Sequence, residues 1–187
     1  MDSKEQELIC SQIAWVERYL YELDWLSPPT PNFSERVAKA NRVAPQFFFM
    51  LRGLLTDAIY LGIARLLDPP EQGTNENLSI QRVINSETSS GSPERTKSQS
   101  QLDEVIKVFS SGRDIRNKIL AHADCKLVMD YQNSVKTNSI PIKTLGEIVE
   151  KIKSILKIIY PNNTLPPHPH DQKDWLGVDT ILNILSK

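Results

Sequence analysis

The feature that most constrains the fold is the uneven placement of glycine and proline along the chain. The 187 residues include only seven glycines and 12 prolines, and the prolines gather in short stretches such as Ser27–Pro31 and Pro161–Pro169. A protein built from sheets needs many tight turns, and glycine is the residue that such turns most often require. Proline, by contrast, ends helices. The chain is therefore predicted to be a set of helices separated by proline-containing breaks.

Apolar residues recur at helical spacing in four long segments. These predicted helices cover residues 5–26, 45–67, 102–123 and 145–160, and shorter helical pieces are predicted from Ser34, over 79–84 and over 175–185. The segment 45–67 is apolar around most of its circumference, which is typical of a central, buried helix. Residues 127–144 are ambiguous, with a brief extended piece expected around 139–142. The predicted fold class is an all-α bundle.

The domain organisation follows from composition. Residues 1–160 are predicted to form the helical bundle. Within it, residues 87–101 contain five serines, two threonines, a glycine and a proline, which predicts a mobile loop. Residues 161–187 are predicted to be a proline-rich linker followed by a C-terminal helix that docks on the bundle through Trp175, Val178, Ile181, Leu182 and Leu185.

Charge and cysteine content limit the partners and the compartment. With 22 basic and 23 acidic side chains the net charge is -1, so any contact with nucleic acid must come from a local basic cluster. Cys10 and Cys125 lie far apart in the sequence, and we expect no disulfides and a reducing compartment. The polar, acidic N-terminus does not resemble a targeting peptide, and Arg52 and Asp57 interrupt the longest apolar run. We therefore expect a cytoplasmic protein with no membrane association.

The stretch most informative about chemistry is residues 112–124. Counted at 100° per residue from Leu102, Arg116 falls inside the apolar arc of the predicted helix 102–123. A guanidinium aimed at an apolar face must be paired or must line a polar groove, because an isolated buried charge is costly. His122 lies at the edge of the arc, and Lys118 is predicted to face solvent.

Each candidate also has a purely structural interpretation. Arg116 could form a buried ion pair within the bundle, with Asp57 as its partner, and His122 could be a helix-face histidine with a backbone or carboxylate partner. Residues 168–171 contain two histidines and an aspartate, but a solvated linker is the favoured interpretation, so no metal site is predicted. The phenylalanine run 47–49 is interpreted as core or dimer interface.

Taken together, several pieces of the sequence resemble the HEPN superfamily. Arg116 and Asn117 are followed after four residues by His122, as in the superfamily's arginine–histidine motif. Together with Leu66-Leu67-Asp68-Pro69, this motif makes residues 13–160 resemble the AbiU-type abortive-infection branch of the superfamily. The resemblance implies a four- to five-helix bundle and a two-fold homodimer with both motifs at one cleft. It also implies metal-independent ribonuclease or toxin activity in antiphage defence, without a cofactor.

One residue departs from a known regulatory pattern of such toxins. HEPN toxins that a partner nucleotidyltransferase inactivates carry a tyrosine two residues after the histidine. This chain has Asp124 at that position, so that mode of regulation is not expected. An antitoxin or another defence-system partner is still part of the expectation.

The chemistry of the residue types gives each candidate a role. His122 can move the proton of the RNA 2′-hydroxyl, Arg116 can hold two phosphate oxygens, and Asn117 can orient the phosphate or the imidazole. The sequence around this stretch is locally basic. The RNA substrate is predicted to be bound by Arg113, Lys118 and Lys126. This set predicts catalysis without a metal.

Two other interpretations of function stay open. The chain could be a non-catalytic HEPN module whose Arg116 and His122 bind nucleotide or RNA. It could also be a helical interaction module of a defence system. The arginine–histidine motif disfavours a plain scaffold, which does not need those side chains.

Overall fold

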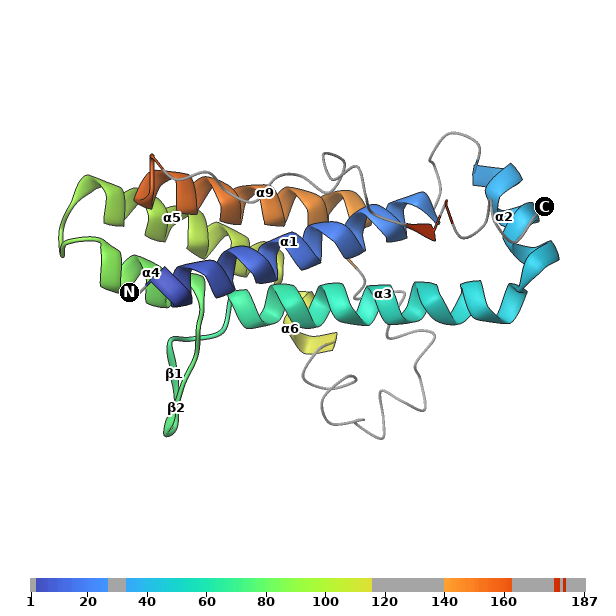
Figure 1. The fold of residues 1–187 in the computed structure, drawn as a ribbon. Helices are drawn as coiled ribbons and strands as arrows, with labels where there is room; N and C mark the ends of the chain where they lie inside the picture. Colours follow the sequence, from blue (N-terminus) through green and yellow to red (C-terminus); the bar gives the residue numbers. More distant parts are fainter. Residues whose placement is uncertain (1–2, 27–32, 116–139, 163–176, 179, 181–187) are drawn as a thin grey trace.

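The computed structural model describes residues 3–26, 33–115, 140–162, 177–178 and 180 of the chain (Figure 1). Within these residues the fold is all-α, as predicted, apart from one two-stranded sheet. The elements are α1 (Ser3–Trp25), α2 (Phe33–Val43), α3 (Pro45–Leu66), β1 (Glu71–Gln72), β2 (Asn75–Glu76), α4 (Ile80–Glu87), α5 (Pro93–Val108), α6 (Ser110–Ile115) and α9 (Ile142–Ile159).

Four long helices form the bundle (Figure 1). Helix α1 lies between α3 and α9 and contacts both, and α9 packs against α5. The short helix α4 packs on α5 and α9 near one end, and α2 packs on α3 at the other. Each of α1, α3, α4, α5 and α9 contributes side chains that are at most 1% exposed, among them Ile13, Ile63, Ile84, Leu102 and Ile152. The helical spacing of apolar residues therefore predicted most of the core, although Leu8 and Val108, which share that spacing, are 51% and 46% exposed.

Helix α3 is buried over only part of its length, which corrects the prediction of a helix buried on all sides. Ile59, Ile63 and Leu66 in its C-terminal half are fully buried. In its N-terminal half Phe48 is buried, whereas Phe49 is 82% exposed. Neighbouring residues point 100° apart on a helix, so packing on one side buries only one residue of the phenylalanine run. Helix α3 is long and apolar enough to cross a membrane, but the core helix of a soluble protein meets the same two criteria.

The predicted mobile loop over 87–101 is wrong for most of its length, because α5 begins at Pro93. The Ser92 hydroxyl accepts a hydrogen bond from the Arg95 backbone N–H at 3.1 Å, which caps the helix, and Pro93 suits its first turn. Ser98 is fully buried, and the side chains of Gln99 and Gln81 exchange hydrogen bonds of 2.8 and 3.0 Å. These contacts hold the segment as helix, and only residues 88–92 connect α4 to α5.

The short hairpin of β1 and β2 was not predicted from the sequence. Glu71 pairs with Glu76 and Gln72 with Asn75, and the turn between them places Gly73 at a φ of 64°, where glycine is favoured. At the other end of the described chain, α9 begins at Ile142, three residues before the predicted start. Ile140 and Pro141 form no strand with any described residue.

The close approach of α1 and α3 gives a first testable prediction. A side chain at Gly62 would collide with the Val16 side chain, so Gly62→Ala should lower the free energy of unfolding by about 1–3 kcal/mol through overpacking. The matched control is Gly53→Ala on the same helix, where nothing lies within 4 Å and alanine should stabilise the helix. Urea unfolding of both variants measures the difference. Equal stability of the two would contradict the packing of α1 on α3.

Candidate active site

Five of the six predicted site residues lie outside the described residues: Arg116, Asn117, Lys118, His122 and Lys126. The sixth, Arg113, is in α6. The structure does describe the chain on either side of residues 116–139, up to Ile115 and from Ile140.

Arg113 ties α6 to the end of α3. Its Nη2 atom donates a hydrogen bond of 2.7 Å to the backbone carbonyl of Leu67, the residue that caps α3. Carbonyls at the end of a helix lack an N–H partner within the helix, and a positive charge is favourable there. The contact involves Leu66–Pro69, one of the two most specific pieces of the sequence, and Arg113, which lies three residues before the other piece, residues 116–122.

The predicted helix over 102–123 is broken at Phe109. Helix α5 ends at Val108 and α6 begins at Ser110, while the Phe109 ring is 1% exposed and lies 5.9 Å from the Tyr60 ring, centroid to centroid. A Cβ at Gly112 would come within 2.5 Å of the Phe109 ring, so the break requires glycine there. Because the helix stops at Phe109, the helical phase counted from Leu102 does not carry over to the residues after it. Val108 lies in α5, before the break, and is 46% exposed, so the predicted apolar arc was also too wide within α5.

The far end of the stretch is also fixed to α3. The backbone N–H of Ile140 donates a hydrogen bond of 2.7 Å to the Tyr60 hydroxyl, and the contact is buried. Burial raises the pKa of Tyr60, and the bond from Ile140 partly offsets that increase. Ile115, which ends α6, is 8% exposed, and α6 packs on α3. Ile115 and Ile140, the described residues that flank 116–139, thus both belong to segments that contact α3.

This contact predicts a cost for removing one hydroxyl. Tyr60→Phe should lower the free energy of unfolding by about 1–3 kcal/mol, because the buried Ile140 N–H loses its acceptor. Tyr19→Phe is the matched control. The Tyr19 ring stacks on Trp15 and packs against the core, but its hydroxyl forms no hydrogen bond with a residue that the structure describes, so its effect should stay within about 0.5 kcal/mol. Chemical denaturation followed by circular dichroism measures both. Equal stability of the two variants would show that the Tyr60–Ile140 bond contributes nothing.

Asp57, the suggested structural partner of Arg116, lies partly buried in α3. Burial raises the pKa of Asp57, and its carboxylate forms no hydrogen bond or ion pair with any residue in the described ranges. Arg116 itself lies outside those ranges, so the ion-pair interpretation stays a prediction.

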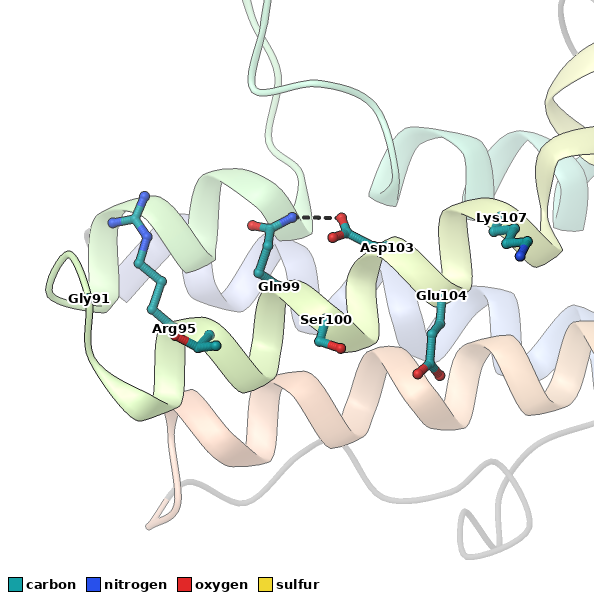
Figure 2. A pocket seen from close by; sticks show the side chains of 8 residues that line it. Gly91, Arg95, Gln99, Ser100, Asp103, Glu104 and Lys107 are labelled. Carbon is teal, nitrogen blue, oxygen red and sulfur yellow. Dashed lines mark hydrogen bonds between the residues drawn. The ribbon is translucent and has the colours of Figure 1, made fainter.

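A surface groove of about 680 Å³ runs along α5 (Figure 2). Its lining residues are Gly91, Arg95, Thr96, Gln99, Ser100, Asp103, Glu104 and Lys107. Gln99 donates to Asp103 at 2.9 Å, and Arg95 donates to Asn85 at 3.0 Å. Two basic and two acidic side chains balance each other in this lining, so the groove lacks the positive potential that attracts phosphate. Arg113 is not among the lining residues.

Metal and thiol chemistry find no support in the parts of the chain that the structure describes. These parts contain no group of three or more histidine, cysteine, aspartate or glutamate side chains that could hold a metal ion. Cys10 is a free, partly buried thiol, and burial raises its pKa, which disfavours the reactive thiolate. The two histidines in 168–171 lie outside the described residues.

Comparison with known proteins finds one family. The HEPN_AbiU2 family model, described as AbiU2, matches residues 5–160, a range that contains nearly all of α1 and every other helix described above. No curated protein and no solved structure matches the chain. The C-terminal segment after residue 160 lies outside the family match.

Proposed function

Because the chain belongs to the HEPN_AbiU2 family of HEPN-type abortive-infection proteins, we propose that it is a metal-independent endoribonuclease acting as an antiphage toxin. The observation that carries the proposal is the hydrogen bond from Arg113 to Leu67. It joins Arg113, three residues before Arg116 in the sequence, to the end of α3, where the other sequence piece typical of the family lies. RNA is the substrate in this proposal, and the cytoplasm is the compartment where the protein meets it.

The reaction follows from the residues of the stretch. His122 takes the proton from a 2′-hydroxyl, which attacks the adjacent phosphorus atom to form a 2′,3′-cyclic phosphate. The bond to the 5′-oxygen of the next nucleotide breaks, and that oxygen leaves as a hydroxyl by taking up a proton from the His122 imidazolium or from water. Arg116 stabilises the negative charge that develops on the phosphate oxygens, and Asn117 orients the phosphate. Lys118 and Lys126 hold neighbouring phosphates. Arg113 can also bind phosphate, because only one of the five N–H donors of its guanidinium forms the hydrogen bond to Leu67.

We further propose that the protein works as a homodimer in which the faces carrying Arg116 and His122 meet. A single histidine and a single arginine are few groups for acid–base catalysis, and a two-fold dimer brings two of each together. Exposed apolar side chains in the N-terminal half of α3 support association: Phe47, Phe49, Met50 and Leu54 are between 43% and 82% exposed. Exposed apolar side chains clustered in this way often mark an interaction surface.

The dimer gives a prediction with a matched control. Light scattering at micromolar concentration should give twice the chain mass of 21.3 kDa. Leu54→Asp should weaken the dimer at least about tenfold, because a charge replaces an apolar contact in the interface. Leu8→Asp is the control, since Leu8 on α1 is similarly exposed, 51% against 57% for Leu54. A monomeric wild type would contradict the dimer, and equal effects of the two variants would exclude α3 from its interface.

Cleavage of RNA tests the proposed reaction. Purified protein should cut total RNA or transfer RNA in the presence of EDTA, because the mechanism uses no metal. Fragments should end in 2′,3′-cyclic phosphate and 5′-hydroxyl, and a substrate with a 2′-deoxy sugar at the cut should resist. Cleavage that stops in EDTA would exclude the mechanism. RNA or nucleotide binding without any cleavage would favour a non-catalytic HEPN module instead.

A further inference from the structure

The C-terminal segment, which lies outside the family match, makes a defined contact with α1. The backbone N–H of Val178 donates a buried hydrogen bond of 2.9 Å to Glu22 Oε2, and Val178 is only 5% exposed. The described part of the segment lies beside the C-terminal end of α1 (Figure 1). Docking of the tail through the apolar residues of 175–185 was predicted from the sequence, and Val178 is the one of those named residues that the structure describes.

The receiving side of this contact is built on α1. Glu22 forms an ion pair of 2.7 Å with Arg18, and the two side chains are only 9% and 8% exposed. The Arg18 guanidinium also lies over the Tyr21 ring, 5.3 Å from its centroid. Partners one turn apart on a single helix hold the Glu22 carboxylate in place, so α1 presents a pre-oriented acceptor to the tail.

The site leaves no room for a side chain at position 177, so it selects glycine there. A Cβ at this position would lie 2.5 Å from Glu22 Oε1 and 3.0 Å from Arg18 Nη2. Both atoms belong to a buried ion pair, and moving them would disturb it at a cost. The site therefore accepts a glycine followed by an aliphatic residue whose N–H reaches Glu22.

The length of the chain allows its own tail to occupy the site. Helix α9 has 18 residues and is about 27 Å long. The residues from 162 to 177 can span up to about 50 Å when extended, which is enough to return along α9 to the C-terminal end of α1.

We propose that the Arg18–Glu22 face of α1 is a peptide-docking site and that the chain's own C-terminal segment is its ligand, recognised through Gly177 and Val178. The contact resembles peptide capture by a fixed acceptor, with Val178 as the apolar anchor that packs into the hydrophobic core. The bound tail can leave, and the same segment supplied as a free peptide can take its place. This inference does not depend on RNA cleavage.

A competition experiment on the full chain tests the site. The probe is a fluorescein-labelled peptide of residues 173–184, and its binding is followed by fluorescence anisotropy. In Gly177→Leu the attached tail should no longer fit, so this variant should bind the probe at least tenfold more tightly than wild type does. Gly146→Leu is the matched control, because nothing lies within 4 Å of a Cβ there, and it should bind the probe as wild type does. A probe that itself carries Gly177→Leu should not bind.

Proteolysis gives a second readout that needs no probe. Trypsin should cut after Lys173 at least several-fold faster in Gly177→Leu than in wild type or Gly146→Leu, because the released tail is accessible. Circular dichroism should show equal helix content in all three proteins. Cleavage at the wild-type rate together with no gain in probe binding would overturn the proposal.

Discussion

His122→Ala should lower the rate of RNA cleavage by about 10²–10⁴-fold, because the 2′-hydroxyl loses the group that takes its proton. Arg116→Ala should lower the rate by a similar factor, about 10²–10³-fold, since the charge that develops on the phosphate is no longer stabilised. Single-turnover cleavage of an end-labelled RNA measures both rates with the protein in excess, which separates chemistry from product release.

Two controls distinguish catalytic roles from structural ones. His168→Ala removes a histidine of the C-terminal linker and should cleave at the wild-type rate. Urea unfolding of His122→Ala and Arg116→Ala should match wild type if both residues act on substrate. A strongly destabilised Arg116→Ala would support the buried ion pair with Asp57 instead, and cleavage at the wild-type rate by either variant would remove that residue from the mechanism.

Lys153→Met should produce a large loss of stability, because the ion pair that it removes is mostly buried. The Lys153 Nζ atom lies 2.7 Å from Glu17 Oε1 and 3.0 Å from Glu150 Oε1, and the Glu17 side chain is only 5% exposed. Removing the lysine leaves the Glu17 carboxylate buried without its cation, which typically costs about 3–5 kcal/mol at neutral pH. Urea unfolding measures the loss, and Glu17→Gln combined with Lys153→Met should recover most of it.

An exposed ion pair formed by another lysine of α9 is the control for this prediction. Lys151 Nζ lies 2.8 Å from Glu104 Oε2, but the two side chains are 47% and 60% exposed, so Lys151→Met should cost less than about 1 kcal/mol. An equal cost for the two variants would show that burial does not govern the effect.

The pH dependence of the Lys153 pair has a definite sign. Burial disfavours the charge, but hydrogen bonds to Glu17 and Glu150 raise the pKa of Lys153 above its ordinary value of 10.5. A raised pKa in the folded state means that the stabilisation is complete below the unfolded value and is lost as pH rises through the folded value. The stability difference between wild type and Lys153→Met should therefore persist at neutral pH and shrink only in strongly alkaline solution.

Apolar spacing predicted the long helices and most of the core, because burial on one face of a helix follows a fixed period. Amino-acid composition was a poor guide for residues 87–101, where it suggested a loop and the structure has mostly helix. The information was present locally, in a serine followed by Pro93 and an acidic residue, which is a typical helix start. The exposed half of α3 could not be predicted in this way, since an apolar sequence does not specify how many neighbours a helix has.

The candidate site was located in the sequence by residue type and spacing, but its geometry depends on contacts between distant parts of the chain. The break at Phe109 arises where its ring meets Tyr60, and the anchoring of Arg113 needs the Leu67 carbonyl. Neither partner can be identified by counting along one helix. The docking of Val178 was predicted from its apolar neighbours, whereas the selectivity for Gly177 follows only from the atoms of Arg18 and Glu22.

The anchoring of both ends of residues 116–139 on α3 has an evolutionary consequence. Between two fixed points a chain can differ in length and sequence while the residues that hold its ends stay in place. The Tyr60–Ile140 bond on one side and the buried Ile115 on the other therefore mark natural crossover points for recombination. Under the proposed function, chimaeras that exchange this stretch between members of the family are expected to transfer substrate preference while each recipient keeps its own scaffold.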